Sequence, residues 1–172
     1  MSKLFDHLMV LLPFENPYFE KAGLSCTFVG HPAARQNQTG IREKFRAEHG
    51  LNNANVIGVF PGSRKSEVRR MLPVFSDAVH LLESDIPNLH VVTTVVSDVR
   101  SMIESSVRKW HIPVTLIESI GNKREAYQGC DVALATSGTV TTELAAAGTP
   151  MVVGYKMAPL TMAVVRRLVK AP

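Results

Sequence analysis

Several features that would mark a special class of protein are rare or missing in this sequence of 172 residues. The only cysteines, Cys26 and Cys130, lie far apart and form no CxxC pair, so we expect two reduced, buried thiols rather than a disulfide framework. No apolar run approaches the roughly 20 residues of a membrane-spanning helix. The short apolar run near the N-terminus follows Asp6 and His7 and precedes no cleavage site of small residues, which indicates a strand and not a signal peptide.

Patterns typical of metal and nucleic-acid sites are also lacking. The six histidines are scattered and form no HExxH motif, so we predict no metal site. The net charge of +4 is compatible with nucleic acid, an anionic membrane surface or a phosphorylated ligand. Aromatic residues make up 6% of the chain and do not alternate with basic ones, so we expect no nucleic-acid partner. With 45% hydrophobic and 20% charged residues, the composition is that of a globular protein.

From residue 53 onward, apolar strands and amphipathic helices alternate regularly. The pattern predicts strands at 55–60, 89–96, 113–117, 131–135 and 150–154, with helices at about 65–84, 98–110, 122–129 and 139–147. This alternation predicts an α/β fold, a Rossmann-like parallel sheet with right-handed crossovers and helices on both faces. We expect residues 40–157 to form one such sheet, with ligands at the carboxyl ends of its strands.

The two ends of the chain differ from this central pattern. Residues 1–32 predict a strand (7–12), a short helix (17–22) and a second strand (26–29), and a polar boundary follows at 33–40. We therefore divide the chain into 1–32, a main domain at 33–158, and a C-terminal segment at 159–172. That last segment predicts an amphipathic helix whose basic residues are Arg166, Arg167 and Lys170. Its apolar side suits either a protein surface or an anionic lipid surface.

The first candidate site is the turn in "VIGVFPGSRKSEVRR", residues 56–70. An apolar strand runs directly into Pro61-Gly62-Ser63-Arg64 and then into a charged helix. A glycine turn at a helix start offers free backbone N–H groups, which the helix dipole makes attractive to anions. The guanidinium of Arg64 can grip a phosphate group at two points. The turn therefore predicts a phosphate site.

The second candidate site lies in "ATSGTVTTELAAAGTP", residues 135–150. Ser137-Gly138-Thr139 forms a turn, and Ser137 or Thr139 is expected to cap the following helix. Glu143 lies one turn further on, where its carboxylate can accept hydrogen bonds from the two vicinal hydroxyls of a ribose. The alternative is an ordinary capping turn with a solvated Glu143, and likewise a plain surface cation at Arg64. Neither loop is a Walker A, GxGxxG or GxSxG motif.

Three blocks of the sequence resemble the lipid-A-disaccharide synthase family of GT-B glycosyltransferases. They are "LLPFENPYFEKAGLSCTFVGHP", "FPGSRKSEVRRMLPVF" and "CDVALATSGTVTTELAAAGTPMVVGYKMAPLTMAVVRRLVKAP". The resemblance implies transfer of 2,3-diacylglucosamine from its UDP conjugate to 2,3-diacylglucosamine 1-phosphate, with inversion and without a metal or cofactor. By motif match, Gly62, Ser63 and Arg64 contact the donor phosphates, and Ser137, Gly138, Thr139 and Glu143 hold the phosphate-ribose region. Arg64 is the expected catalytic residue, neutralising the UDP leaving group.

The resemblance covers only the C-terminal part of such enzymes, which are about twice as long. We therefore expect a fragment, the nucleotide-binding half, that is inactive alone because the acidic general base belongs to the missing half. Glu15 either borders the cleft or is a carboxylate at a helix start. The resemblance implies a cytoplasmic protein at the inner face of the membrane, and a homo-oligomer is compatible with it. The alternatives are another UDP-sugar GT-B enzyme of the UDP-N-acetylglucosamine epimerase type, or a non-catalytic UDP-binding remnant at the membrane.

Overall fold

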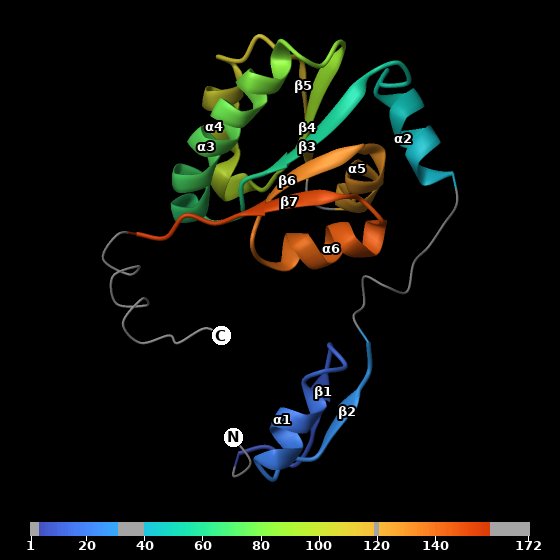
Figure 1. The fold of residues 1–172 in the computed structure, drawn as a ribbon, viewed down its shortest axis with the longest axis vertical. Helices are drawn as coiled ribbons and strands as arrows, with labels where there is room; N and C mark the ends of the chain where they lie inside the picture. The colour runs from blue at the N-terminus through green and yellow to red at the C-terminus, as the bar shows by residue number, and fades with distance from the viewer. Residues whose placement is uncertain (1–3, 31–39, 119–120, 159–172) are drawn as a thin grey trace. The chain divides into compact units, whose positions relative to one another are not determined.

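The computed structural model describes residues 4–30, 40–118 and 121–158, and the chain divides into two compact units, residues 1–37 and 38–172 (Figure 1). The first unit contains β1 (Leu8–Val10), α1 (Asn16–Lys21) and β2 (Cys26–Phe28). Its two strands pair in parallel, and their register places Met9 opposite Thr27. The predicted order of strand, helix and strand is confirmed, although both strands are shorter than the sequence pattern indicated.

The second unit contains a five-stranded sheet in which every pair of neighbouring strands is parallel. Its strands are β3 (Asn55–Phe60), β4 (Leu89–Val95), β5 (Val114–Glu118), β6 (Val132–Thr136) and β7 (Met151–Gly154), arranged in the order β5-β4-β3-β6-β7. The central strands are apolar on both sides, as Val91 and Val92 of β4 show by both being fully buried. The prediction of one parallel sheet within residues 40–157 is therefore confirmed.

Helices cover both faces of this sheet. They are α2 (Ile41–Glu48), α3 (Lys65–Glu83), α4 (Ser97–Val107), α5 (Lys123–Gly129) and α6 (Thr139–Ala147). Figure 1 shows α3 and α4 on one side of the sheet and α5 and α6 on the other. The prediction of helices on both faces is confirmed, with bounds that differ by up to three residues.

Helix α2 is the one described helix that the sequence pattern did not predict. Its sequence, IREKFRAE, is mostly charged, and Phe45 is the only buried residue in it. Only Ile41, Phe45 and Ala47 of its eight residues are apolar, and the segment is too short for helical periodicity to be recognised. The helix is instead held by tertiary contacts: Phe45 packs among side chains of α5 and β6, and Arg42 and Arg46 bind Asp131.

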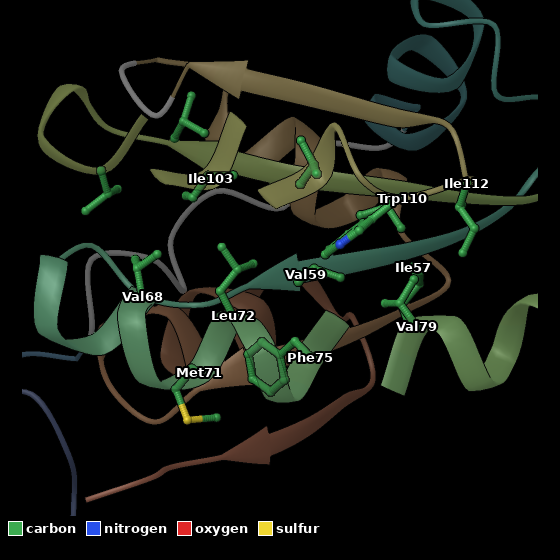
Figure 2. Packing of buried hydrophobic residues seen from close by; sticks show 14 of the residues in the cluster. Ile57, Val59, Val68, Met71, Leu72, Phe75, Val79, Ile103, Trp110 and Ile112 are labelled. Atoms are coloured by element: carbon green, nitrogen blue, oxygen red, sulfur yellow. The ribbon is translucent and has the colours of Figure 1, made fainter. Parts of the chain in front are cut away.

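Two apolar clusters fill the spaces between the sheet and its helices. The larger one joins β3 and β4 to α3 and α4, and Figure 2 shows Met71, Leu72 and Phe75 of α3 beneath the strand that carries Val59. The smaller one joins the other face of the sheet to α2, α5 and α6. Each fully buried side chain of this size contributes about 1.5–3 kcal/mol. Packing on both faces therefore holds the strand ends, and the loops that follow them, in fixed positions.

Both cysteines are free thiols in the structure, but only Cys130 is buried as the sequence predicted, whereas Cys26 is partly exposed. Cys130 is buried at the end of α5, and burial raises its pKa to about 12. The neighbouring carboxylate of Asp131 raises this pKa further, whereas Arg46 and Arg42 oppose the shift. A thiol with such a pKa is protonated at neutral pH, so Cys130 acts as a packing residue.

Candidate functional site

A cavity of about 350 Å³ lies at the carboxyl edge of the sheet. Its walls come from the ends of β3, β4 and β6 and from the first turns of α3, α5 and α6. Strands β3 and β6 are direct neighbours, so the loops that follow them meet at this edge. All seven residues that the sequence singled out line the cavity: Gly62, Ser63, Arg64, Ser137, Gly138, Thr139 and Glu143.

The loop after β3 differs from the sequence expectation in one respect. Its backbone N–H groups are not free, because those of Ser63 and Arg64 donate to Oε2 of Glu67 at 3.3 and 3.4 Å. Nη1 of Arg64 also donates to Oε1 of Glu67, at 2.8 Å. Glu67 therefore accepts hydrogen bonds from the backbone N–H groups and the guanidinium that the sequence predicts as phosphate donors. Sequence reasoning missed Glu67, although a glutamate three residues after the helix start is the signal of a capping box.

Gly62 is required for this loop geometry. Its φ of +111° lies in a region that other residues rarely adopt. In addition, a Cβ atom at this position would lie 2.6 Å from Oε2 of Glu67, well inside van der Waals contact. The glycine thus lets the Glu67 side chain fold back over the loop. Arg64, by contrast, remains 80% exposed at the side chain and is free to reorient toward a ligand.

The loop after β6 presents an open helix N-terminus to the cavity. Gly138 is the N-cap residue of α6 and no side chain caps the helix, so the expected capping by Ser137 or Thr139 is wrong. Instead, Oγ1 of Thr141 donates to the carbonyl oxygen of Gly138 at 2.7 Å. The first turn of α6 contains no acidic residue. Since the first backbone N–H groups of a helix have no partner within the helix, α6 offers the better anion site of the two loops.

Glu143 lines the cavity from the second turn of α6, and two residues of α5 bind it. Its Oε1 pairs with Nζ of Lys123, and its Oε2 accepts a hydrogen bond from the hydroxyl of Tyr127 at 3.1 Å. Lys123 and Tyr127 are four residues apart and therefore lie on the same side of α5. Sequence reasoning missed both, because their only signal is this spacing on a short helix.

Tyr127 is largely buried against the end of β3. Its ring meets the ring of Phe60 edge to face, with the centroids 4.9 Å apart. Burial raises the pKa of the Tyr127 hydroxyl, and the charge and hydrogen bond of Glu143 raise it further. Tyr127 is therefore protonated at any physiological pH, so its hydroxyl is a permanent hydrogen-bond donor to the carboxylate.

The charged side chains of the cavity balance one another. Arg64 is paired with Glu67, and Lys123 is paired with Glu143. Among residues 4–30, 40–118 and 121–158, no three His, Cys, Asp or Glu side chains gather closely enough to hold a metal ion. Because Lys123 stays paired with Glu143, the negative charge of a ligand must be met by the exposed Arg64 side chain and the α6 N-terminus.

Glu15 belongs to the other unit of the chain. It is the N-cap residue of α1, and its Oε2 accepts a hydrogen bond from the backbone N–H of Leu12 at 2.9 Å. Glu15 thus lies at a helix start, as one of the two alternatives has it, but its side chain binds the segment before the helix and makes no capping hydrogen bond to the helix.

Within the described part of the chain, no helix is both long and apolar enough to cross a membrane.

Solved structures with a similar fold define the structural class. The chain superimposes on WaaG, a glycosyltransferase involved in lipopolysaccharide biosynthesis, with a TM-score of 0.59 and 17% identity over 92% of this chain and 47% of that one. The wall teichoic acid polymerase TagF gives a TM-score of 0.60 with 12% identity, over 98% of this chain and 42% of that one. The fold is thus a parallel sheet with helices on both faces, as found in one half of GT-B glycosyltransferases.

Sequence comparison then defines the family. The family model described as lipid-A-disaccharide synthetase matches residues 1–172, so the chain belongs to the lipid-A-disaccharide synthase family. The lipid-A-disaccharide synthase of Rhodospirillum centenum is 42% identical over 99% of this chain, and that of Ruegeria pomeroyi is 42% identical over 98%. The chain spans only 43% and 45% of the length of these two relatives.

Proposed function

We propose that this chain is the donor-binding part of a lipid-A-disaccharide synthase. The reaction transfers 2,3-diacylglucosamine from its UDP conjugate to 2,3-diacylglucosamine 1-phosphate, which yields the lipid A disaccharide 1-phosphate and UDP. One observation carries the proposal: in a chain of this family, the loops after β3 and β6 and the Glu143 carboxylate converge on one cavity at the carboxyl edge of the sheet. Ligands of open α/β sheets bind at this edge.

In this proposal the diphosphate and the ribose of UDP bind different residues of the cavity. The diphosphate binds the open N-terminus of α6 at Gly138 and Thr139, where no carboxylate of the protein competes. Arg64 turns from Glu67 toward the same phosphates, which its exposed side chain allows. The ribose hydroxyls donate to the carboxylate of Glu143, which lies on the second turn of the same helix.

The proposed chemistry is a direct displacement at the anomeric carbon of the donor, with inversion. Negative charge grows on UDP as it leaves, and Arg64 together with the α6 N-terminus neutralises that charge. The base that activates the acceptor hydroxyl comes from the part of the relatives that this chain does not span. We therefore expect the chain alone to bind the donor nucleotide without turnover.

The lipid substrates place the proposed reaction at a membrane surface. We propose the cytoplasmic face of the inner membrane, where the acyl chains remain in the bilayer while the sugar nucleotide reaches the cavity. The basic segment 159–170, predicted from sequence to be an amphipathic helix, lies outside the described residues. Its three cations would each add about 1 kcal/mol of attraction to anionic lipid.

The family match decides between the enzyme alternatives. A UDP-N-acetylglucosamine epimerase of GT-B fold is not supported, because the whole chain matches the lipid-A-disaccharide synthetase model. A non-catalytic UDP-binding remnant at the membrane stays a second candidate, because the family match does not test turnover. Both candidates bind UDP, and they differ in whether the part of the relatives that this chain does not span restores turnover: it does in the main proposal and does not for a remnant.

Calorimetric titration of UDP tests the binding proposal. We expect Arg64→Ala and Glu143→Ala each to weaken UDP binding about tenfold or more, because each removes a hydrogen-bonding partner with a full charge, worth about 1.5–3 kcal/mol. Lys44→Ala is the control, since Lys44 is exposed on α2 and does not line the cavity. Equal UDP affinities for the unmodified chain, Arg64→Ala and Glu143→Ala would end the assignment.

A further inference from the structure

Glu143 has a separate partner on each of its two carboxylate oxygens. Lys123 binds Oε1, and Tyr127 donates to Oε2. The last torsion of a glutamate side chain is broad, so a carboxylate held at one oxygen can still rotate. Two partners on different oxygens, both from α5, fix that rotation. The Glu143 side chain is 23% exposed, so it is partly sheltered yet open to the cavity.

The partners leave part of the carboxylate free. An ionised carboxylate has about four acceptor positions, two on each oxygen. The ammonium of Lys123 and the hydroxyl of Tyr127 use one position on each oxygen. One position therefore remains on Oε1 and one on Oε2. Two neighbouring acceptors suit two neighbouring hydroxyl donors, as in the 2′,3′-diol of a ribose.

We propose that Lys123 and Tyr127 are positioning residues, which hold the Glu143 carboxylate so that its two free acceptor positions face the ribose diol of the bound nucleotide. This inference rests on the proposed function, because it takes the ribose as the partner of Glu143. It assigns no contact between Lys123 or Tyr127 and the ligand. Their effect passes through the orientation of one carboxylate.

The two residues suit this role for different reasons. Lys123 supplies a positive charge, which pairs with Oε1 of the Glu143 carboxylate. Tyr127 supplies a rigid anchor, because its ring is packed edge to face against Phe60 and its hydroxyl stays protonated. The Lys123 ammonium and the Tyr127 hydroxyl, both on one side of α5, thus fix the direction of the Glu143 carboxylate.

Comparison of UDP with 2′-deoxy-UDP isolates the ribose contact, since the two ligands differ in one hydroxyl. We expect the unmodified chain to bind UDP more tightly by about fivefold to tenfold, and Glu143→Ala to bind both ligands equally. Lys123→Met and Tyr127→Phe should each lower this preference by about threefold or more, because the carboxylate is then free to rotate. Lys123→Arg should keep the preference, since a guanidinium can make the same ion pair.

Matched controls separate positioning from simpler roles. Lys44→Met removes an exposed lysine that pairs with Glu48 on α2, away from the cavity, and should leave the preference unchanged. Thermal unfolding of every variant shows whether the fold is retained. Inorganic pyrophosphate, titrated into the same set, reports on the phosphate site alone and should bind Lys123→Met and Tyr127→Phe as it binds the unmodified chain.

Each other outcome overturns a definite claim. If Lys123→Met weakens UDP, 2′-deoxy-UDP and pyrophosphate by the same factor, Lys123 contacts the phosphates and positions nothing. If both variants lose only stability while the preference is kept, the Lys123–Glu143 pair merely joins α5 to α6. If the unmodified chain does not distinguish UDP from 2′-deoxy-UDP, the ribose assignment of the proposed function fails first, and the positioning role fails with it.

Discussion

At the residue scale, Asp131 joins helix α2 to the sheet just before β6 begins. Its carboxylate accepts hydrogen bonds from Nη2 of Arg46 at 2.6 Å and from the backbone N–H of Val56 at 2.8 Å, and it also pairs with Arg42. Burial alone would raise the pKa of Asp131, but these donors outweigh burial and lower the pKa below its ordinary value of 3.8. The ionised carboxylate is therefore the form that stabilises the fold.

This lowered pKa predicts a pH-dependent effect of Asp131→Asn. At pH 7 we expect the variant to lower the free energy of unfolding by about 1 kcal/mol, a modest value because the carboxylate is partly exposed. Since the folded pKa lies below the unfolded one, this stabilisation is present above pH 3.8 and is lost as the pH falls through the folded pKa. Urea unfolding at pH 7, 5 and 3 measures it. A difference that stays constant down to pH 3 would contradict the ionised form as the cause.

At the element scale, α2 and α5 approach closely because α5 ends in a glycine. A Cβ atom on Gly129 would lie 2.2 Å from a ring carbon of Phe45, the buried residue of α2. Nε of Arg46 also donates to the carbonyl oxygen of Gly129 at 2.9 Å. The close contact between these two short helices therefore requires a glycine, which has no side chain, at position 129.

Gly129→Ala should therefore push α2 away from α5. We expect it to lower the free energy of unfolding by about 1–3 kcal/mol through overpacking. Phe45→Leu removes the ring that causes the clash, so the double variant should be more stable than the sum of the two single losses predicts. Urea unfolding of the four proteins gives this coupling energy. If the losses in unfolding free energy of the two single variants simply add, the effect of Gly129→Ala comes from the backbone at this position and not from a clash with Phe45.

At the scale of the whole molecule, the two units differ in how well they bury apolar side chains. Both hydrophobic clusters lie in residues 38–172. A two-stranded sheet with one short helix is too small to form a core of its own. The described part of residues 1–37 accordingly leaves many large apolar side chains exposed: Leu4, Phe5, Met9, Leu11, Leu12, Phe14, Tyr18 and Phe28.

A chain of residues 38–172 should therefore keep the main properties of this protein. We expect it to unfold cooperatively and to bind UDP within about twofold of the full chain, because every residue that lines the cavity lies in this unit. It should also bind the dye ANS less strongly, since the exposed apolar side chains of residues 1–37 are gone. Thermal unfolding, calorimetry and ANS fluorescence provide the three measurements. A large loss of UDP affinity would show that residues 1–37 contribute to the site.

The sequence by itself determined the sheet and the two loops of the candidate site. Strand and helix periods in this region are strong because the strands are buried on both faces and the helices carry a continuous apolar side. The turns at Gly62 and Gly138 are also local signals, since strand, glycine turn and helix follow one another directly in the chain. A parallel sheet then brings all such turns to one edge.

Only the tertiary structure decided how the charged side chains of the site are paired. Lys123 and Glu143 are 20 residues apart, and they meet because α5 and α6 share one face of the sheet. Helix α2 likewise owes its place to Phe45 and to the ion pairs with Asp131, not to a pattern of its own. Local sequence encodes the propensity of a segment, whereas a long-range ion pair depends on distances that exist only after the helices have packed.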